Sequence, residues 1–285
     1  MKETSITTST RDLMKKYDFR TAKKFGQNFL VDESILKAII DCSELSKEDC
    51  VLEIGPGLGV MTQVLCEKAG KVLAVEIDKN LIPILRVSLF GFDNVKLIND
   101  DILKLDLKKV LEEIFGNTPV KVVANLPYYI TTPIIMKLLE EGINLKSITI
   151  MVQKEVGERL GAAPGGKDYG ALSVAVQYRC IPHKVLIVPP ESFIPQPEVE
   201  SMVVRLDYRE KPPVTLHDEK MYFRVVKASF GQRRKTLLNA LASGNLGKSK
   251  EELRMILSKN NIDENRRGET LSLEEFARIA NELSR

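Results

Sequence analysis

Short apolar segments alternate with helical segments through the first half of the chain, and this alternation constrains the fold more than any other feature. Five segments rich in Val and Ile, at residues 51–54, 71–76, 95–98, 120–124 and 147–152, are joined by stretches with helical apolar spacing. Strands that are apolar along their whole length are typical of parallel sheets covered by helices on both faces. The chain is therefore predicted to be an α/β protein with a mostly parallel sheet.

The pattern changes after residue 180. Residues 184–188 and 201–206 read as two more strands, separated by the proline-rich stretch 189–197, and we expect them to pair at one end of a seven-stranded sheet. Paired prolines make residues 207–213 a linker, and residues 218–285 have helical spacing throughout. We predict a basic arm at 1–24, a large domain at 25–207, and a linker with a small all-α domain at 208–285. Pro83 would interrupt a helix begun at Asp78, so that helix is expected to start late or kink.

Composition excludes several classes of protein. No apolar run approaches the roughly 18 residues that span a bilayer, and the N-terminus lacks the apolar core of a secretory signal. The four Cys show no C-x-x-C spacing and there are two His, which argues against a structural zinc site and a disulfide framework. We expect a cytoplasmic protein without a metal.

Basic residues are unevenly distributed although the formal net charge is only +3. One cluster lies in the N-terminal arm and another follows residue 232. This distribution favours a phosphate-rich partner. The candidate residues for contacting phosphates are Lys15, Lys16, Arg20, Lys23, Lys24, Arg233, Arg234 and Lys235.

Three successive strand ends carry residues that suit an adenosine-bearing ligand. Gly55 and Gly57 follow the first strand, where open α/β sheets bind ligands and where missing side chains let the backbone approach one. Glu76 ends the second strand and can accept both hydroxyls of a ribose. Asp101 follows the third strand and can accept the amino group of an adenine. The G-x-G-x-G spacing differs from the dinucleotide fingerprint, so the ligand is expected to lack a pyrophosphate.

The tetrapeptide Asn125-Leu126-Pro127-Tyr128 ends the fourth strand and indicates the reaction. The exocyclic amine of adenine is a poor nucleophile, since its lone pair is delocalised into the ring. Its methylation requires acceptors for both N–H bonds, and the Asn125 amide oxygen with the Leu126 carbonyl supplies two. Pro127 would fix the turn, and Tyr128 would stack on the base.

On these motifs the chain resembles the ribosomal RNA adenine dimethyltransferase family, a branch of the class I methyltransferases that use S-adenosylmethionine. The matching segments are residues 24–30 (KFGQNFL), 53–59 (EIGPGLG), 76–78 (EID), 99–101 (NDD), 125–129 (NLPYY), 193–201 (FIPQPEVES) and 230–237 (FGQRRKTL). The resemblance implies a Rossmann-like fold and a methyl-donor site lined by Asn28, Leu30, Gly55, Gly57, Glu76, Asp101 and Asn125. It also implies that Phe193 closes on the target adenine opposite Tyr128.

Within this family, Leu126, Tyr129 and residues 230–237 resemble the small-subunit group. That group dimethylates the N6 amines of two adjacent adenines in a hairpin loop near the 3′ end of small-subunit (16S) rRNA and helps ribosome biogenesis. The expected partner is therefore the immature small ribosomal subunit, with the chain acting as a monomer and without a membrane. The alternative within the family is a large-subunit rRNA adenine dimethyltransferase that confers macrolide resistance.

Two readings from other classes remain open. A nicotinamide-dependent oxidoreductase would share the glycine loop and Glu76, but it would not require residues 125–128. A ribosome-assembly factor whose catalysis is secondary would still bind the immature subunit when catalytically inactive.

Overall fold

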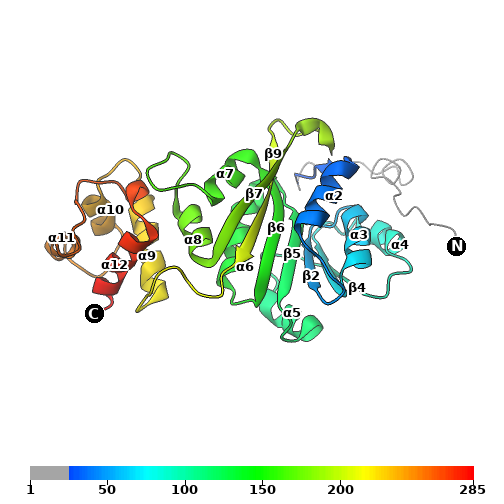
Figure 1. The fold of residues 1–285 in the computed structure, drawn as a ribbon, viewed down its shortest axis with the longest axis horizontal. Coiled ribbons are helices and arrows are strands. Elements are labelled where there is room, and N and C mark those ends of the chain that lie inside the picture. The colour runs from blue at the N-terminus through cyan, green and yellow to red at the C-terminus, as the bar shows by residue number, and fades with distance from the viewer. Residues whose placement is uncertain (1–25) are drawn as a thin grey trace. The chain divides into compact units, whose positions relative to one another are not determined.

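The structure is a computed structural model that describes residues 26–285, and these divide into two units (Figure 1). The first unit takes the described residues through Gly157 together with Pro182–Tyr208, and the second takes Glu158–Ile181 and Arg209–Arg285. The sequence analysis divided the chain between residues 207 and 208. The difference arises because Tyr169, Val174 and Tyr178 belong to the apolar core of the C-terminal helices. The expected basic arm at 1–24 lies outside the described residues.

A seven-stranded sheet organises the described part of the first unit, in the order β4-β3-β2-β5-β6-β9-β7. The first five of these strands are parallel, and β9 is antiparallel to β6. This confirms the predicted α/β fold with a mostly parallel sheet, and the two late strands are neighbours at one end, as expected. The strands are β2 (Cys50–Ile54), β3 (Lys71–Glu76), β4 (Val95–Asn99), β5 (Val120–Asn125), β6 (Leu145–Gln153), β7 (Cys180–Val188) and β9 (Ser201–Tyr208).

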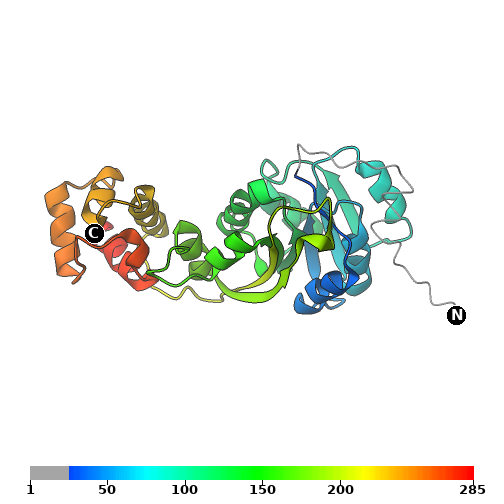
Figure 2. The same ribbon diagram turned by 90° about the horizontal axis from the view of Figure 1, so that it is seen from above.

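Helices cover both faces of this sheet (Figure 1 and Figure 2). They are α2 (Glu33–Cys42), α3 (Val60–Lys68), α4 (Ile82–Ser88), α5 (Leu107–Phe115), α6 (Thr131–Glu140) and α7 (Lys154–Leu160). Against one face, apolar residues of α2 and α3 pack with alternate strand residues such as Val51, Val72 and Val123. Helix α4 starts at Ile82 with Pro83 in its first turn, which confirms that this helix begins late.

A second, two-stranded sheet was not predicted. Strand β1 (Phe29–Leu30) pairs antiparallel with β8 (Phe193–Ile194), and the Val31 N–H donates to the Ser192 carbonyl at 2.8 Å. Three short 3₁₀ helices also occur in the described residues: η2 (Tyr128–Ile130), η3 (Pro190–Ser192) and η4 (Gly268–Thr270). The β1–β8 pair ties residues 28–30 to a loop more than 160 positions later in the sequence.

The second unit is helical in the described residues. Its helices are α8 (Ala171–Arg179), α9 (Glu219–Gly231), α10 (Leu237–Ser243), α11 (Lys250–Lys259) and α12 (Leu273–Leu283). Ser249 and Ser272 cap α11 and α12 in reciprocal capping boxes with Glu252 and Glu275, which satisfies orphan backbone N–H groups. No helix among residues 26–285 is both long and apolar enough to cross a membrane.

Candidate active site at the carboxyl edge of the sheet

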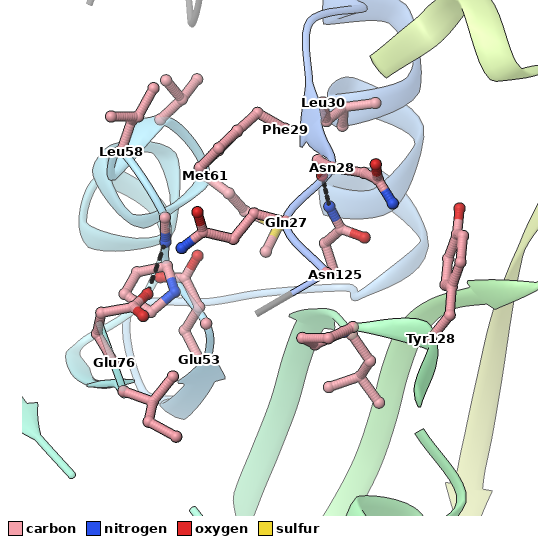
Figure 3. A pocket seen from close by; sticks show the side chains of 18 of the residues that line it. Gln27, Asn28, Phe29, Leu30, Glu53, Leu58, Met61, Glu76, Asn125 and Tyr128 are labelled. Atoms are coloured by element: carbon pink, nitrogen blue, oxygen red, sulfur yellow. Dashed lines mark hydrogen bonds between the residues drawn. The ribbon is translucent and has the colours of Figure 1, made fainter. Parts of the chain in front are cut away.

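A cavity lies in the first unit where β2, β3 and β5 end (Figure 3). Because these strands are parallel, their carboxyl ends meet at one edge of the sheet, and the segments that follow them face each other. Residues 26–30, around β1, complete the enclosure. The lining comes from residues 26–30, 36, 39, 53, 55–58, 60, 61, 76, 77 and 125–130. Most of the residues predicted to contact the methyl donor or the target base therefore come together here.

The glycine loop forms one wall of the cavity between β2 and α3. Gly55 and Gly57 have φ angles of 70° and 60°, a conformation that costs most side chains energy. A Cβ on Gly55 would meet nothing within 4 Å, so this backbone is open to a ligand. A Cβ on Gly57 would lie 2.9 Å from the Phe29 ring, so a side chain there would collide with the segment that covers the loop.

Glu76 lies at the end of β3 and is 3% exposed. Its carboxylate accepts the backbone N–H of Asp78 at 2.8 Å and that of Gly57 at 3.2 Å. Burial raises the pKa of Glu76 to about 7, although these two hydrogen bonds favour the charged form. Glu76 therefore links the glycine loop to β3 and holds a carboxylate that is poised to titrate near neutral pH.

Glu53 is a second buried carboxylate of the lining, and it is fully buried within β2. Neither of its carboxylate oxygens has a hydrogen-bond partner in the part of the chain that the structure describes. Burial raises the pKa of Glu53 to about 8; the nearby Thr62 hydroxyl opposes that shift, and the charge of Glu76 adds to it. A buried acceptor without a donor costs free energy, so Glu53 is a candidate to bind a cationic or donor group.

Asn125 ends β5 with its amide held in one orientation. Its Nδ2 donates to the Asn28 carbonyl at 3.0 Å, so Oδ1 remains available as an acceptor (Figure 3). Figure 3 shows this oxygen on the side of the amide that faces Tyr128. The Leu126 N–H donates to the Met151 carbonyl at 3.1 Å, which anchors the backbone to β6. Among the described residues, no group donates a hydrogen bond to the Leu126 carbonyl.

Tyr128 follows Pro127 at the start of η2. Pro127 has φ −60° and ψ 132°, and its carbonyl accepts from the Ile130 N–H and the Thr131 hydroxyl, which closes the turn. The Tyr128 hydroxyl lies 2.5 Å from the Ser201 hydroxyl, and its ring is partly buried. Burial raises the pKa of Tyr128, so the phenol is neutral at physiological pH.

Two of the residues predicted to contact the methyl donor or the target base do not line this cavity. Asp101 follows β4, where its carboxylate accepts the Leu103 N–H at 3.0 Å and lies 3.7 Å from the Lys104 ammonium. Phe193 is 1% exposed and packs in the apolar cluster beneath α2 and α3. The contact of Asp101 with a donor and the stacking of Phe193 on a base remain predictions.

The basic candidates fall in two places. Lys15, Lys16, Arg20, Lys23 and Lys24 lie outside the described residues. Arg234 and Lys235 are exposed in the turn between α9 and α10. Arg233 in the same turn donates to the Lys167 carbonyl at 2.8 Å and pairs with Glu269 at 3.4 Å. Part of its donor capacity is therefore used within the second unit.

The sequence analysis missed several residues of the lining. Gln27, whose Nε2 donates to Asp78 at 3.2 Å, and the half-exposed Tyr129 both border the cavity. Glu53 was quoted only as part of a motif. An acidic residue inside a strand that is otherwise Cys, Val, Leu and Ile is a signal that could have identified it.

Comparisons with known proteins point to one family. A family model described as ribosomal RNA adenine dimethylase matches residues 18–284. A "Ribosomal RNA small subunit methyltransferase A" from Alkaliphilus oremlandii is 56% identical over 97% of this chain and 96% of its own length. One from Clostridioides difficile is 51% identical, over 96% and 94%. Among solved structures, a dimethyladenosine transferase from Plasmodium falciparum has a TM-score of 0.74 at 27% identity, covering 88% of this chain and 95% of its own. The 23S rRNA methyltransferase ErmE has a TM-score of 0.67 at 25% identity, covering 90% of this chain and 100% of its own.

Proposed function

Because the chain belongs to the ribosomal RNA adenine dimethylase family, we propose that it dimethylates the N6 amines of two adjacent adenines in a hairpin loop near the 3′ end of small-subunit rRNA, with S-adenosylmethionine as methyl donor. The observation that carries this proposal is the orientation of Asn125. Its amide nitrogen is committed to the Asn28 carbonyl, so its oxygen is left as an acceptor inside the cavity. An acceptor there suits an amine that must lose its conjugation with the purine ring.

The Asn125 Oδ1 and the Leu126 carbonyl oxygen act as the pair of acceptors. As the amine nitrogen becomes tetrahedral and positive, its two N–H bonds polarise, and oxygens already in place stabilise that charge without reorganisation. Each acceptor of this kind contributes about 3 kcal/mol to transition-state stabilisation. The Leu126 backbone is held to β6 and its side chain is 1% exposed, so this oxygen has little freedom to move.

Tyr128 supplies the surface on which the adenine stacks. A base in folded RNA must first leave its neighbours, at a cost of a few kcal/mol that is smaller in a loop. Stacking on an aromatic ring recovers about 1–3 kcal/mol per base. Phe193 is assigned to the opposite face of the base. Its ring is buried in the described structure, so this assignment requires the ring to turn out of its apolar cluster.

The residues at the other end of the cavity fit the methyl donor. Glu76 would accept the ribose hydroxyls, Gly55 and Gly57 would let the backbone approach, and Asn28 and Leu30 line the same space. Glu53 suits the donor's ammonium group, whose positive charge would favour the ionised form of this carboxyl. Asp101 is assigned to the adenine amino group. When bound, S-adenosylmethionine supplies a methyl group activated by a sulfonium. In Figure 3, Glu53 and Glu76 lie on one side of the cavity and Tyr128 lies on the other. Asn125 lies between them, and so between the proposed positions of the methyl donor and the target base.

The small subunit is favoured as substrate over the large subunit. The relatives named for the small subunit are 51% and 56% identical, whereas ErmE, named for 23S rRNA, is 25% identical. The exposed Arg234 and Lys235 would contact RNA phosphates, as would the basic arm. We infer that the chain acts as a cytoplasmic monomer on immature small subunits. Family membership sets aside the nicotinamide-dependent oxidoreductase.

Mass mapping of methylated nucleotides tests this function. Small ribosomal subunits that lack the modification are incubated with the protein and S-adenosylmethionine, and large subunits are treated in parallel. We expect two adjacent dimethylated adenines near the 3′ end of the small-subunit rRNA and none in the large-subunit rRNA. Methylation confined to the large-subunit rRNA would refute the proposal. A Glu76→Ala protein that still supports subunit maturation would show that an assembly role accompanies catalysis.

A further inference from the structure

Ser201 has a buried hydroxyl. Among the described residues, its side chain has one hydrogen-bond partner, and that partner lies in the candidate active site. It is the first residue of β9 and is fully buried. Its Oγ lies 2.5 Å from the hydroxyl of Tyr128, 73 positions earlier in the sequence. The hydrogen bond therefore joins the tip of the Tyr128 ring to the seven-stranded sheet.

The backbone that carries Ser201 is fixed on both sides. Ser201 pairs with Gln153 of β6 in the antiparallel register. One residue earlier, the Glu200 carbonyl accepts the Lys154 N–H at 2.9 Å, and the two side chains form an ion pair at 2.7 Å. The position of Ser201 is therefore set by the sheet, and it does not depend on where the Tyr128 side chain lies.

Tyr128 itself is less constrained at its other end. It sits in η2, which is only three residues long and has no side-chain cap. Two side-chain torsions place a tyrosine ring, so a short backbone element alone leaves the ring axis free to swing about the first torsion. A hydrogen bond to the hydroxyl, which lies on that axis, fixes the direction in which the ring points.

From this geometry we propose that Ser201 is a positioning residue, which fixes the direction of the Tyr128 ring axis so that the target adenine stacks with its amine against Asn125. The proposal rests on the proposed function, because it assigns Ser201 a role in base presentation at that same site. Dispersion and stacking fall steeply with small displacements, and a misplaced base loses its alignment with both acceptors. Ser201 touches neither reactant and acts through Tyr128.

A double-mutant cycle separates this role from a purely structural one. The variants are Ser201→Ala, Tyr128→Phe and the double variant, none of which removes the aromatic ring. The control is Thr149→Val on β6, which also removes a buried hydroxyl, one that has no partner among the described residues. Each protein is assayed for single-turnover methyl transfer to unmodified small subunits, for affinity for S-adenosylmethionine, and for thermal stability.

We expect each single variant to lower the single-turnover rate about three- to tenfold, the range set by the net free energy of one hydrogen bond. The double variant should lose no more than either single one, because both substitutions break the same bond. Donor affinity should stay within about twofold of wild type, and Thr149→Val should leave the rate unchanged. A wild-type rate in Ser201→Ala, additive losses in rate, or coupling seen only in the melting temperature would overturn the positioning role.

Two further variants keep this test distinct from that of the function. If Tyr128→Ala and Asn125→Ala slow transfer while Ser201→Ala does not, the positioning role alone fails. If Tyr128→Ala and Asn125→Ala also retain the wild-type rate, the proposed function of the cavity fails with it.

Discussion

Replacing Glu53 by Gln should remove a pH-dependent loss of stability. Glu53 is fully buried without a partner, and its pKa in the folded chain is raised to about 8. In the unfolded chain a glutamate titrates near its usual value of about 4.3. The folded state therefore binds this proton more tightly. The stabilisation is complete below the unfolded pKa and is lost as the pH rises through the folded one.

The size of the effect follows from these two pKa values. Each pH unit between them lowers the free energy of unfolding by about 1.4 kcal/mol, with rounding near each end. From pH 5 to pH 8 Glu53 should cost the wild-type protein about 3.5 kcal/mol, or roughly 7–14 °C in melting temperature. The neutral amide of Glu53→Gln stays buried and unpaired at every pH, so the difference between the proteins grows with pH.

Differential scanning calorimetry at several pH values between 5 and 9 measures this difference, since it can resolve the transitions of the two units. The matched control is Glu67→Gln on α3, which removes the same charge from an exposed side chain. It should follow the wild type at every pH. Equal pH slopes for the wild type and Glu53→Gln would show that Glu53 is solvated or paired in solution, and the reasoning from burial would be wrong.

The remaining predictions concern the donor, the RNA and the glycine loop. Affinity for S-adenosylmethionine should fall as the pH drops below about 7, because protonated Glu76 cannot accept both ribose hydroxyls. Titration calorimetry at pH 6 and pH 8 measures this, and equal affinities at the two pH values would contradict it. Replacing Arg234 and Lys235 by Gln should weaken binding to small subunits and reduce the slope of log K against log[salt] by about 1.4. Filter binding at several salt concentrations measures this slope, and an unchanged slope would show that the two residues do not contact the RNA. Gly57→Ala should cost about 1–2 kcal/mol of stability, since its φ is 60° and the new Cβ would lie 2.9 Å from the Phe29 ring; a wild-type melting temperature would argue against that contact.

Local patterns were enough to predict the framework of the sheet. The strands expected at 71–76 and 120–124 occur as β3 and β5, because continuous apolar segments have few alternatives to burial between helices. Parallel topology then placed Glu76 and Asn125 at one edge. The delayed start of α4 followed from the fixed φ of Pro83.

Features that depend on contacts between segments far apart in the sequence could not be predicted from local patterns. Strands β1 and β8 are two residues long, too short for any periodicity, and each exists because of the other. The bond from Tyr128 to Ser201 joins segments with no local relation. Residues 158–181 belong to the second unit because Tyr169 and Tyr178 pack in its core, and the helical spacing of α8 does not reveal which core it joins.

Single-turnover methyl transfer by Asn125→Ala tests the role of the amide oxygen most directly. S-adenosylmethionine affinity is measured alongside it, since Asn125 also lines the donor cavity. The loss of one preorganised acceptor should slow transfer by about 10²–10³-fold, well beyond any weakening of donor binding. A rate near that of the wild type, with the donor saturating, would mean that the target amine is held by other groups and would contradict the account.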